Sequence, residues 1–167
     1  MSNKFQPIIA ECVDIARIYD EKIKENPCNQ YLHEHKINRM CDTANGTQLC
    51  FYGFLNNVLV CEAVATVSLS NKHTQNIDKI MTSSSAYLSA FETKESFRGL
   101  GYFSALYKFM EIKLKNMGFK YLVLGVEPNE LKNKAIYQKW GYTELIYIGT
   151  EEFDGLHVDV EYYRKKL

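Results

Sequence analysis

One short segment combines a basic side chain, two glycines and the expected start of a helix: Arg98-Gly99-Leu100-Gly101-Tyr102-Phe103-Ser104. The N–H groups in the first turn of a helix have no intrahelical partner, and the helix dipole places partial positive charge on them. Glycine permits tight turns and lets a ligand approach the backbone closely. The segment therefore predicts a binding site for an anion such as a diphosphate.

The glycine segment alone does not define a nucleotide site. A dinucleotide-binding fingerprint needs a third glycine, and a P-loop needs Gly-Lys followed by Ser or Thr, but neither pattern follows Gly101. The alternative is a turn that only begins a helix. A second segment, Tyr137-Gln138-Lys139-Trp140-Gly141-Tyr142, lies further along the chain, and its separation from the first favours a specific site.

Metal binding is not predicted. His33 and His35 flank Glu34 on an expected helix, where side chains two positions apart lie on different faces. The cysteines contain no C-x-x-C pair and are expected to be reduced thiols, buried or half-buried: Cys12, Cys28, Cys41, Cys50 and Cys61.

The hydrophobic pattern predicts a mixed α/β chain. Strands are expected at residues 4–9, 48–55, 58–69, 85–93, 121–126, 143–150 and 158–163, with hairpin turns at Asn56-Asn57 and Asp154-Gly155. Helices are expected at residues 12–26, 29–43, 103–117 and 130–140, and a loop at 70–84. The clearest helix carries one apolar face, formed by Phe103, Leu106, Tyr107, Met110, Leu114 and Met117.

Length and charge restrict the class of protein. A chain of 167 residues is expected to form one domain, residues 1–167. Twenty basic residues balance 20 acidic ones, so no net charge favours nucleic acid or a membrane surface as a partner. No signal-like or membrane-spanning segment is recognisable, and the expected location is the cytoplasm.

The two segments together resemble the GNAT superfamily of acyl-CoA-dependent N-acetyltransferases. That family carries [R/Q]-x-x-G-x-[G/A] before a helix, which Arg98 and Gly101 match and from which Phe103 departs. It also carries a tyrosine followed by three residues and Gly-Phe or Gly-Tyr, matched by Tyr137 and Gly141-Tyr142. Glu130 stands where the family usually has asparagine, although Asn129 is one position away, and Asn133 stands where it has alanine.

The resemblance implies a fold and a cofactor. The fold would be a central, mostly antiparallel mixed sheet of about six to seven strands, flanked by about four helices, with two strands splayed apart. Pantetheine would bond the free edge near residues 91–93, and the diphosphate would meet the N–H groups of residues 99–104. The implied coenzyme A residues are Phe91, Thr93, Arg98, Gly99, Leu100, Gly101, Tyr102, Phe103, Ser104, Asn133 and Lys139.

The resemblance also implies transfer of an acetyl or other short acyl group from acetyl-CoA to a primary amine, by direct attack. Tyr137 would protonate the leaving thiolate, and Glu92 would be the base, with Glu62 as an alternative or water as intermediary. Strand alternation places Glu92 with Leu88 and Ala90, opposite Ser89, Phe91 and Thr93. The departures from the family pattern leave a second hypothesis open, a non-catalytic acyl-CoA-binding module.

The acceptor is expected to be a small-molecule or peptide amine. In the family its pocket is built from the first helices and the last hairpin, here residues 27–36 and 151–157. Glu151, Glu152 and Asp154 would attract a cationic amine there, or else form a solvated acidic turn. A homodimer, formed by exchange or pairing of the last two strands, is also left open.

Overall fold

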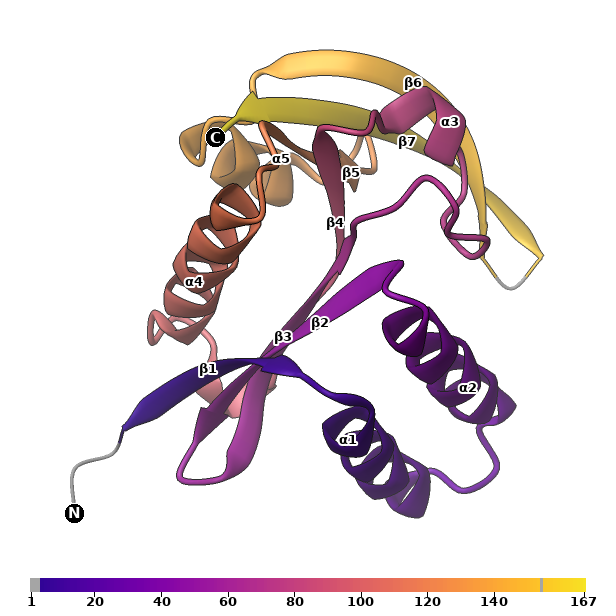
Figure 1. Cartoon of the computed structure of the whole chain (residues 1–167), viewed down its shortest axis with the longest axis vertical. Coiled ribbons are helices and arrows are strands. Elements are labelled where there is room, and N and C mark those ends of the chain that lie inside the picture. Colours follow the sequence, from indigo (N-terminus) through magenta and orange to yellow (C-terminus); the bar gives the residue numbers. More distant parts are fainter. Residues whose placement is uncertain (1–3, 154) are drawn as a thin grey trace.

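In the part of the chain that the structure describes, seven strands form one sheet in the order β1-β2-β3-β4-β5-β7-β6 (Figure 1). The computed structural model describes residues 4–153 and 155–167, so Asp154, expected in the last turn, lies outside the described residues. The strands are β1 (Phe5–Ala10), β2 (Gln48–Leu55), β3 (Val58–Thr66), β4 (Ser85–Thr93), β5 (Tyr121–Val126), β6 (Glu144–Phe153) and β7 (Leu156–Lys166). Among these described strands, β4 and β5 pair in parallel and the other neighbours pair antiparallel.

Helices cover both faces of this sheet (Figure 1). They are α1 (Cys12–Glu25), α2 (Gln30–Ala44), the single turn α3 (Ile77–Ile80), α4 (Tyr102–Asn116) and α5 (Leu131–Lys139). A 3₁₀ turn, Glu95–Phe97, joins β4 to the loop before α4. None of the helices in residues 4–153 and 155–167 has the length and apolar character needed to cross a membrane.

Alternation along the strands divides the core between these helices. On one face, Ala63, Ala65 and Leu88 pack with Leu106 and Met110 of α4. On the other, Cys50, Tyr52 and Val64 pack with α1. Along residues 63–65 of β3, successive buried side chains therefore point alternately to the α4 core and the α1 core.

The order and type of the predicted elements are confirmed, but several boundaries were wrong. β3 ends at Thr66 rather than at 69, and β6 and β7 extend to Phe153 and Lys166. The expected loop at 70–84 contains α3, whose four residues are too few to establish a helical period. Met117 is 54% exposed instead of sharing the buried face, because it follows the last turn of α4.

The predicted splay is present between β4 and β5. Their parallel pairing covers only residues Ser85–Leu88 and Tyr121–Leu124. Beyond this point β5 continues beside β7, as far as the pair Val126 and Glu161, while β4 continues beside β3. The two central strands thus diverge, as Figure 1 shows, and leave an opening in the middle of the sheet.

A bulge in β4 accompanies the splay. Ala90 has a φ of +53°, in the left-handed region, and the register shifts between the pairs Glu62–Glu92 and Val64–Ser89. The extra residue breaks the alternation of the strand. Glu92 therefore lies on the same face as Ser89, and the predicted grouping of Glu92 with Leu88 was wrong.

Candidate active site

The start of α4 presents backbone N–H groups. Gly99 and Gly101 have φ values of +74° and +83°, which only glycine adopts readily. The first helical hydrogen bond runs from the Ala105 N–H to the Gly101 carbonyl at 3.1 Å. The N–H groups of residues 102–104 precede this bond, as an anion site requires.

Beside this helix start lies a cavity of about 620 Å³, called here the smaller cavity. Seven of the expected cofactor residues line it: Phe91, Thr93, Arg98, Phe103, Ser104, Asn133 and Lys139. The Arg98 Nε donates to the Thr93 carbonyl at 3.1 Å, which closes the end of the free edge of β4. Phe103 forms a wall by packing on Phe91, with ring centroids 5.1 Å apart.

The other four expected cofactor residues, Gly99, Leu100, Gly101 and Tyr102, are not among the described residues that line the smaller cavity. The Tyr102 ring turns toward Phe5 and Phe97, with centroids at 5.3 and 6.1 Å, and the Leu100 side chain is 62% exposed. These residues therefore offer a ligand their backbone rather than their side chains.

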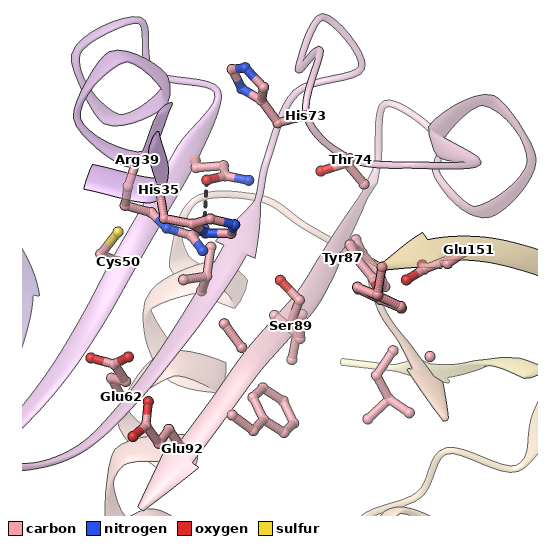
Figure 2. A pocket seen from close by; sticks show the side chains of 18 of the residues that line it. His35, Arg39, Cys50, Glu62, His73, Thr74, Tyr87, Ser89, Glu92 and Glu151 are labelled. Carbon is pink, nitrogen blue, oxygen red and sulfur yellow. Dashed lines mark hydrogen bonds between the residues drawn. The ribbon is translucent and has the colours of Figure 1, made fainter. Parts of the chain in front are cut away.

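A cavity of about 790 Å³, the larger cavity, is lined by residues of α1, α2, β3 and β4 among other elements (Figure 2). Tyr31, Leu32 and His35 line it from the first expected acceptor segment, and Glu151 and Phe153 from the second. Glu152 does not line it; its N–H and carbonyl bond the Gln75 side chain, both at 2.9 Å. The two cavities share Phe91, Glu92 and Asn133 and therefore meet at the splay.

Tyr137 lies in α5 at this junction and lines the larger cavity. Its ring packs against Phe91, Trp140 and Tyr142, with centroids at 6.1, 5.9 and 6.5 Å. Burial, and then the nearby Glu130, raise the pKa of Tyr137 above that of an ordinary phenol. The hydroxyl is therefore protonated at neutral pH, as a proton donor must be.

Glu130 and Asn133 shape the start of α5. Glu130 is the residue before the first helical turn, and its Oε2 accepts a hydrogen bond of 2.7 Å from the Asn133 amide. Both side chains line the larger cavity, so the two departures from the family pattern are partners of each other.

Glu92 and Glu62 share one cation. The Lys22 Nζ lies 2.7 Å from the Glu62 carboxylate and 3.4 Å from that of Glu92, and all three line the larger cavity. Burial raises the pKa of Glu62, Lys22 opposes this shift, and Glu92 adds to it. The bulge at Ala90 is what brings Glu92 to the face of Glu62.

Several polar residues of the larger cavity were not predicted as site residues. Arg39 lies in α2, whose apolar pattern is weak, and its hydrogen-bond partner Gln48 is at the start of the following strand, β2. Tyr87 and Ser89 were predicted only as strand residues. Their positions on either side of Leu88 indicate that both side chains lie on the same face of the strand.

The site has the features that the resemblance to acyl-CoA-dependent acyltransferases predicts: parted strands, a free helix start and two joined cavities. A model of the acetyltransferase (GNAT) family matches residues 14–142. The chain belongs to the acetyltransferase (GNAT) family.

Solved structures support the same fold. A probable acetyltransferase from Staphylococcus epidermidis is 14% identical, with a TM-score of 0.72 over 98% of this chain and 99% of that one. The ribosomal-protein-S18-alanine N-acetyltransferase from Escherichia coli is 16% identical, with a TM-score of 0.69 over 98% and 94%. PaiA N-acetyltransferase from Thermoplasma acidophilum, in complex with coenzyme A, is 13% identical, with a TM-score of 0.60 over 98% and 99%. A search of curated proteins by sequence gave no significant match.

The residues present fit coenzyme A. The smaller cavity joins an apolar wall at Phe91 and Phe103 to the cations Arg98 and Lys139 and to Ser104 at the helix start. Such a lining suits a ligand with a thiol-bearing arm at one end and phosphate groups at the other.

Replacing Gly101 by alanine is expected to lower coenzyme A affinity about tenfold, because a Cβ in the left-handed conformation costs about 1–2 kcal/mol and displaces the helix start. The matched control is Gly118→Ala after the other end of α4, where φ is +94° and a Cβ meets no atom within 4 Å. Isothermal titration calorimetry with coenzyme A compares the two. Equal loss of affinity in both variants would contradict a specific role for the Gly101 turn.

Proposed function

We propose that this protein transfers an acetyl or short acyl group from acetyl-CoA to a primary amine. The observation that supports this most is the meeting of the two cavities at Phe91, Glu92 and Asn133, where the strands diverge. A cofactor in one cavity and an acceptor in the other would bring their reactive groups together beside Tyr137. The gain is that of proximity, since an attack between two bound partners avoids the entropic cost of their encounter.

In this proposal acetyl-CoA supplies a thioester, whose carbonyl carbon forms the new bond with nitrogen and whose carbon–sulfur bond breaks. Tyr137 gives its proton to the departing sulfur, and the second proton that the nitrogen loses as it becomes an amide restores the phenol through solvent. Glu92 accepts a proton from the acceptor's ammonium, directly or through water, with Glu62 as the alternative carboxylate. Lys22 lies within ion-pair distance of both carboxylates, and its charge opposes the rise that burial causes in the pKa of Glu62.

The proposal extends to the setting of the reaction. The five cysteines are free thiols, which agrees with a reducing compartment such as the cytoplasm. The whole chain, residues 1–167, would act as one domain. One structural neighbour is named as an N-acetyltransferase of a ribosomal-protein alanine. The acceptor proposed for this chain is not restricted to that substrate and includes small-molecule and peptide amines.

Two measurements test the proposed function. Calorimetry is expected to show binding of coenzyme A, and a thiol-release assay with acetyl-CoA is expected to show turnover on some member of a panel of polyamines, aminoglycosides, amino acids and peptides. Absence of coenzyme A binding would overturn the cofactor assignment. Binding with no thiol release across the panel would instead support a non-catalytic acyl-CoA-binding module.

A further inference from the structure

Arg39 places a guanidinium in the wall of the larger cavity (Figure 2). Its Nη1 donates to the Gln48 Oε1 at 2.8 Å, and it also hydrogen-bonds the Tyr19 phenol. Both partners are uncharged side chains. In residues 4–153 and 155–167, no carboxylate forms a salt bridge with Arg39.

The groups around Arg39 do not neutralise it. Burial raises the pKa of the neighbouring Cys50 thiol to about 11, so this thiol is uncharged at neutral pH. Burial likewise raises the pKa of the Tyr19 and Tyr52 phenols. The guanidinium therefore keeps its whole charge in a partly desolvated place, which is costly without an anion.

The carboxylates nearest to the α2 wall of the cavity already have partners. Lys22 pairs with Glu62 and Glu92, and the Asp42 carboxylate lies 2.9 Å from the His73 ring. Lys22 and Arg39 are the two lysine or arginine side chains among the described lining residues, so Arg39 is the one without a carboxylate.

Arg39 and Tyr137 reach the cavity from opposite faces of the sheet. Arg39 comes from α2, on the α1 face of the sheet, whereas Tyr137 packs with the α4 core on the opposite face. Glu127 and Glu130 line the cavity on the Tyr137 side. A molecule with an anion at one end and an amine at the other would lie with its anion at Arg39 and its amine toward Tyr137.

We propose that the acceptor is a small amine that also carries a carboxylate, such as a free amino acid, and that Arg39 binds this carboxylate. The proposal rests on the proposed function. A guanidinium offers five N–H donors in a planar fork that matches the two oxygens of a carboxylate. The volume of about 790 Å³ is that of a small-molecule site.

The test compares amino acids with their decarboxylated amines in the thiol-release assay: lysine with cadaverine, ornithine with putrescine, tyrosine with tyramine and histidine with histamine. The wild-type protein is expected to show a kcat/KM at least about a hundredfold higher for the carboxylate-bearing member of the pair it uses best. Phosphoethanolamine against β-alanine forms a further arm, which distinguishes a phosphate acceptor from a carboxylate one.

Arg39→Met is expected to raise KM for the carboxylate-bearing acceptor about a hundredfold, with a smaller change in kcat, and to bring the ratio within the pair close to one. Arg39→Lys should restore part of the preference, because it restores the charge without the fork. The matched control is Arg17→Met on α1, where the Arg17 side chain is 48% exposed and pairs with Glu21. Melting temperature and coenzyme A affinity report whether each variant is folded.

Three results would overturn the proposal. The first is a wild-type protein that uses the decarboxylated amines as well as the amino acids or better. The second is an equal loss on both members of a pair in Arg39→Met, which would mean that Arg39 only ties α2 to Gln48. The third is coenzyme A binding together with acylation of carboxylate-free amines or phosphoethanolamine alone, an outcome that leaves the proposed function standing.

Discussion

Tyr137→Phe is expected to lower kcat about a hundredfold or more at neutral pH and to leave coenzyme A affinity within twofold of the wild-type value. The substitution removes the proton that the departing sulfur would take up but keeps the ring, whose centroid lies 6.1 Å from that of Phe91. Single-turnover acetylation and calorimetry with coenzyme A measure the two quantities.

The pKa shift gives this prediction a pH dependence. Because burial raises the pKa of Tyr137, the phenol stays protonated at least up to the ordinary tyrosine value, and wild-type activity should not decline on the basic side below about pH 10. Glu92→Gln should instead lower kcat/KM, because an amide cannot accept the proton of the acceptor's ammonium group.

The matched control for Tyr137 is Tyr121→Phe. Tyr121 begins β5, contacts the Arg164 guanidinium at 4.6 Å through its ring, and is absent from the described lining of both cavities. Its turnover should equal that of the wild-type protein. A Tyr137→Phe protein with undiminished turnover would remove Tyr137 from the mechanism.

Lys22→Met is expected to lower the free energy of unfolding by about 3 kcal/mol at neutral pH. The Glu62 side chain is 15% exposed and would keep its charge beside Glu92 with no cation to offset it. Urea denaturation at pH 7.5, with wild-type protein in parallel, measures the loss.

This loss should shrink in acid. Burial raises the folded-state pKa of Glu62 above its ordinary value of 4.5, and removal of Lys22 raises it further. A raised carboxyl pKa means that the folded state binds more protons than the unfolded state, so stability falls as pH rises through that window. The difference between Lys22→Met and wild type should therefore be smaller near pH 4.5 than at pH 7.5.

Lys24→Met on the same helix is the control, because Lys24 is exposed and its replacement should change stability by less than about 0.5 kcal/mol. A deficit in Lys22→Met that is the same at both pH values would mean that the loss comes from packing of the aliphatic stem rather than from the charge of Glu62.

Much of the fold follows from local patterns. The apolar residues of α4 recur with the period of a helix, and the short continuous apolar run of β5 is typical of a strand covered on both faces. The turn at Asn56-Asn57 was equally predictable, and both residues have the positive φ values, 51° and 65°, of a two-residue hairpin. The bulge at Ala90 could not be predicted, because no glycine or proline marks it and the sequence around it alternates like an ordinary strand.

The site divides in the same way. Short sequence motifs identified Arg98, Ser104 and Tyr137 as site residues, and all three line one of the cavities. Lys22 lies 40 residues from its partner Glu62, and Arg39 contacts Gln48 in the next element of the chain, β2. A long charged side chain on a helix is usually a solvated one, and only the tertiary packing of α1 and α2 shows otherwise.

The short parallel ladder between β4 and β5 has a thermodynamic consequence. It spans only Ser85–Leu88 and Tyr121–Leu124, so few hydrogen bonds unite strands β1 to β4 with strands β5, β7 and β6. A ligand bridging the gap would contribute directly to cohesion between the two parts. Such a ligand would bind only when the two parts of the sheet are assembled, so its binding free energy would stabilise both parts against unfolding. Amide hydrogen exchange would therefore slow in both parts when the ligand binds.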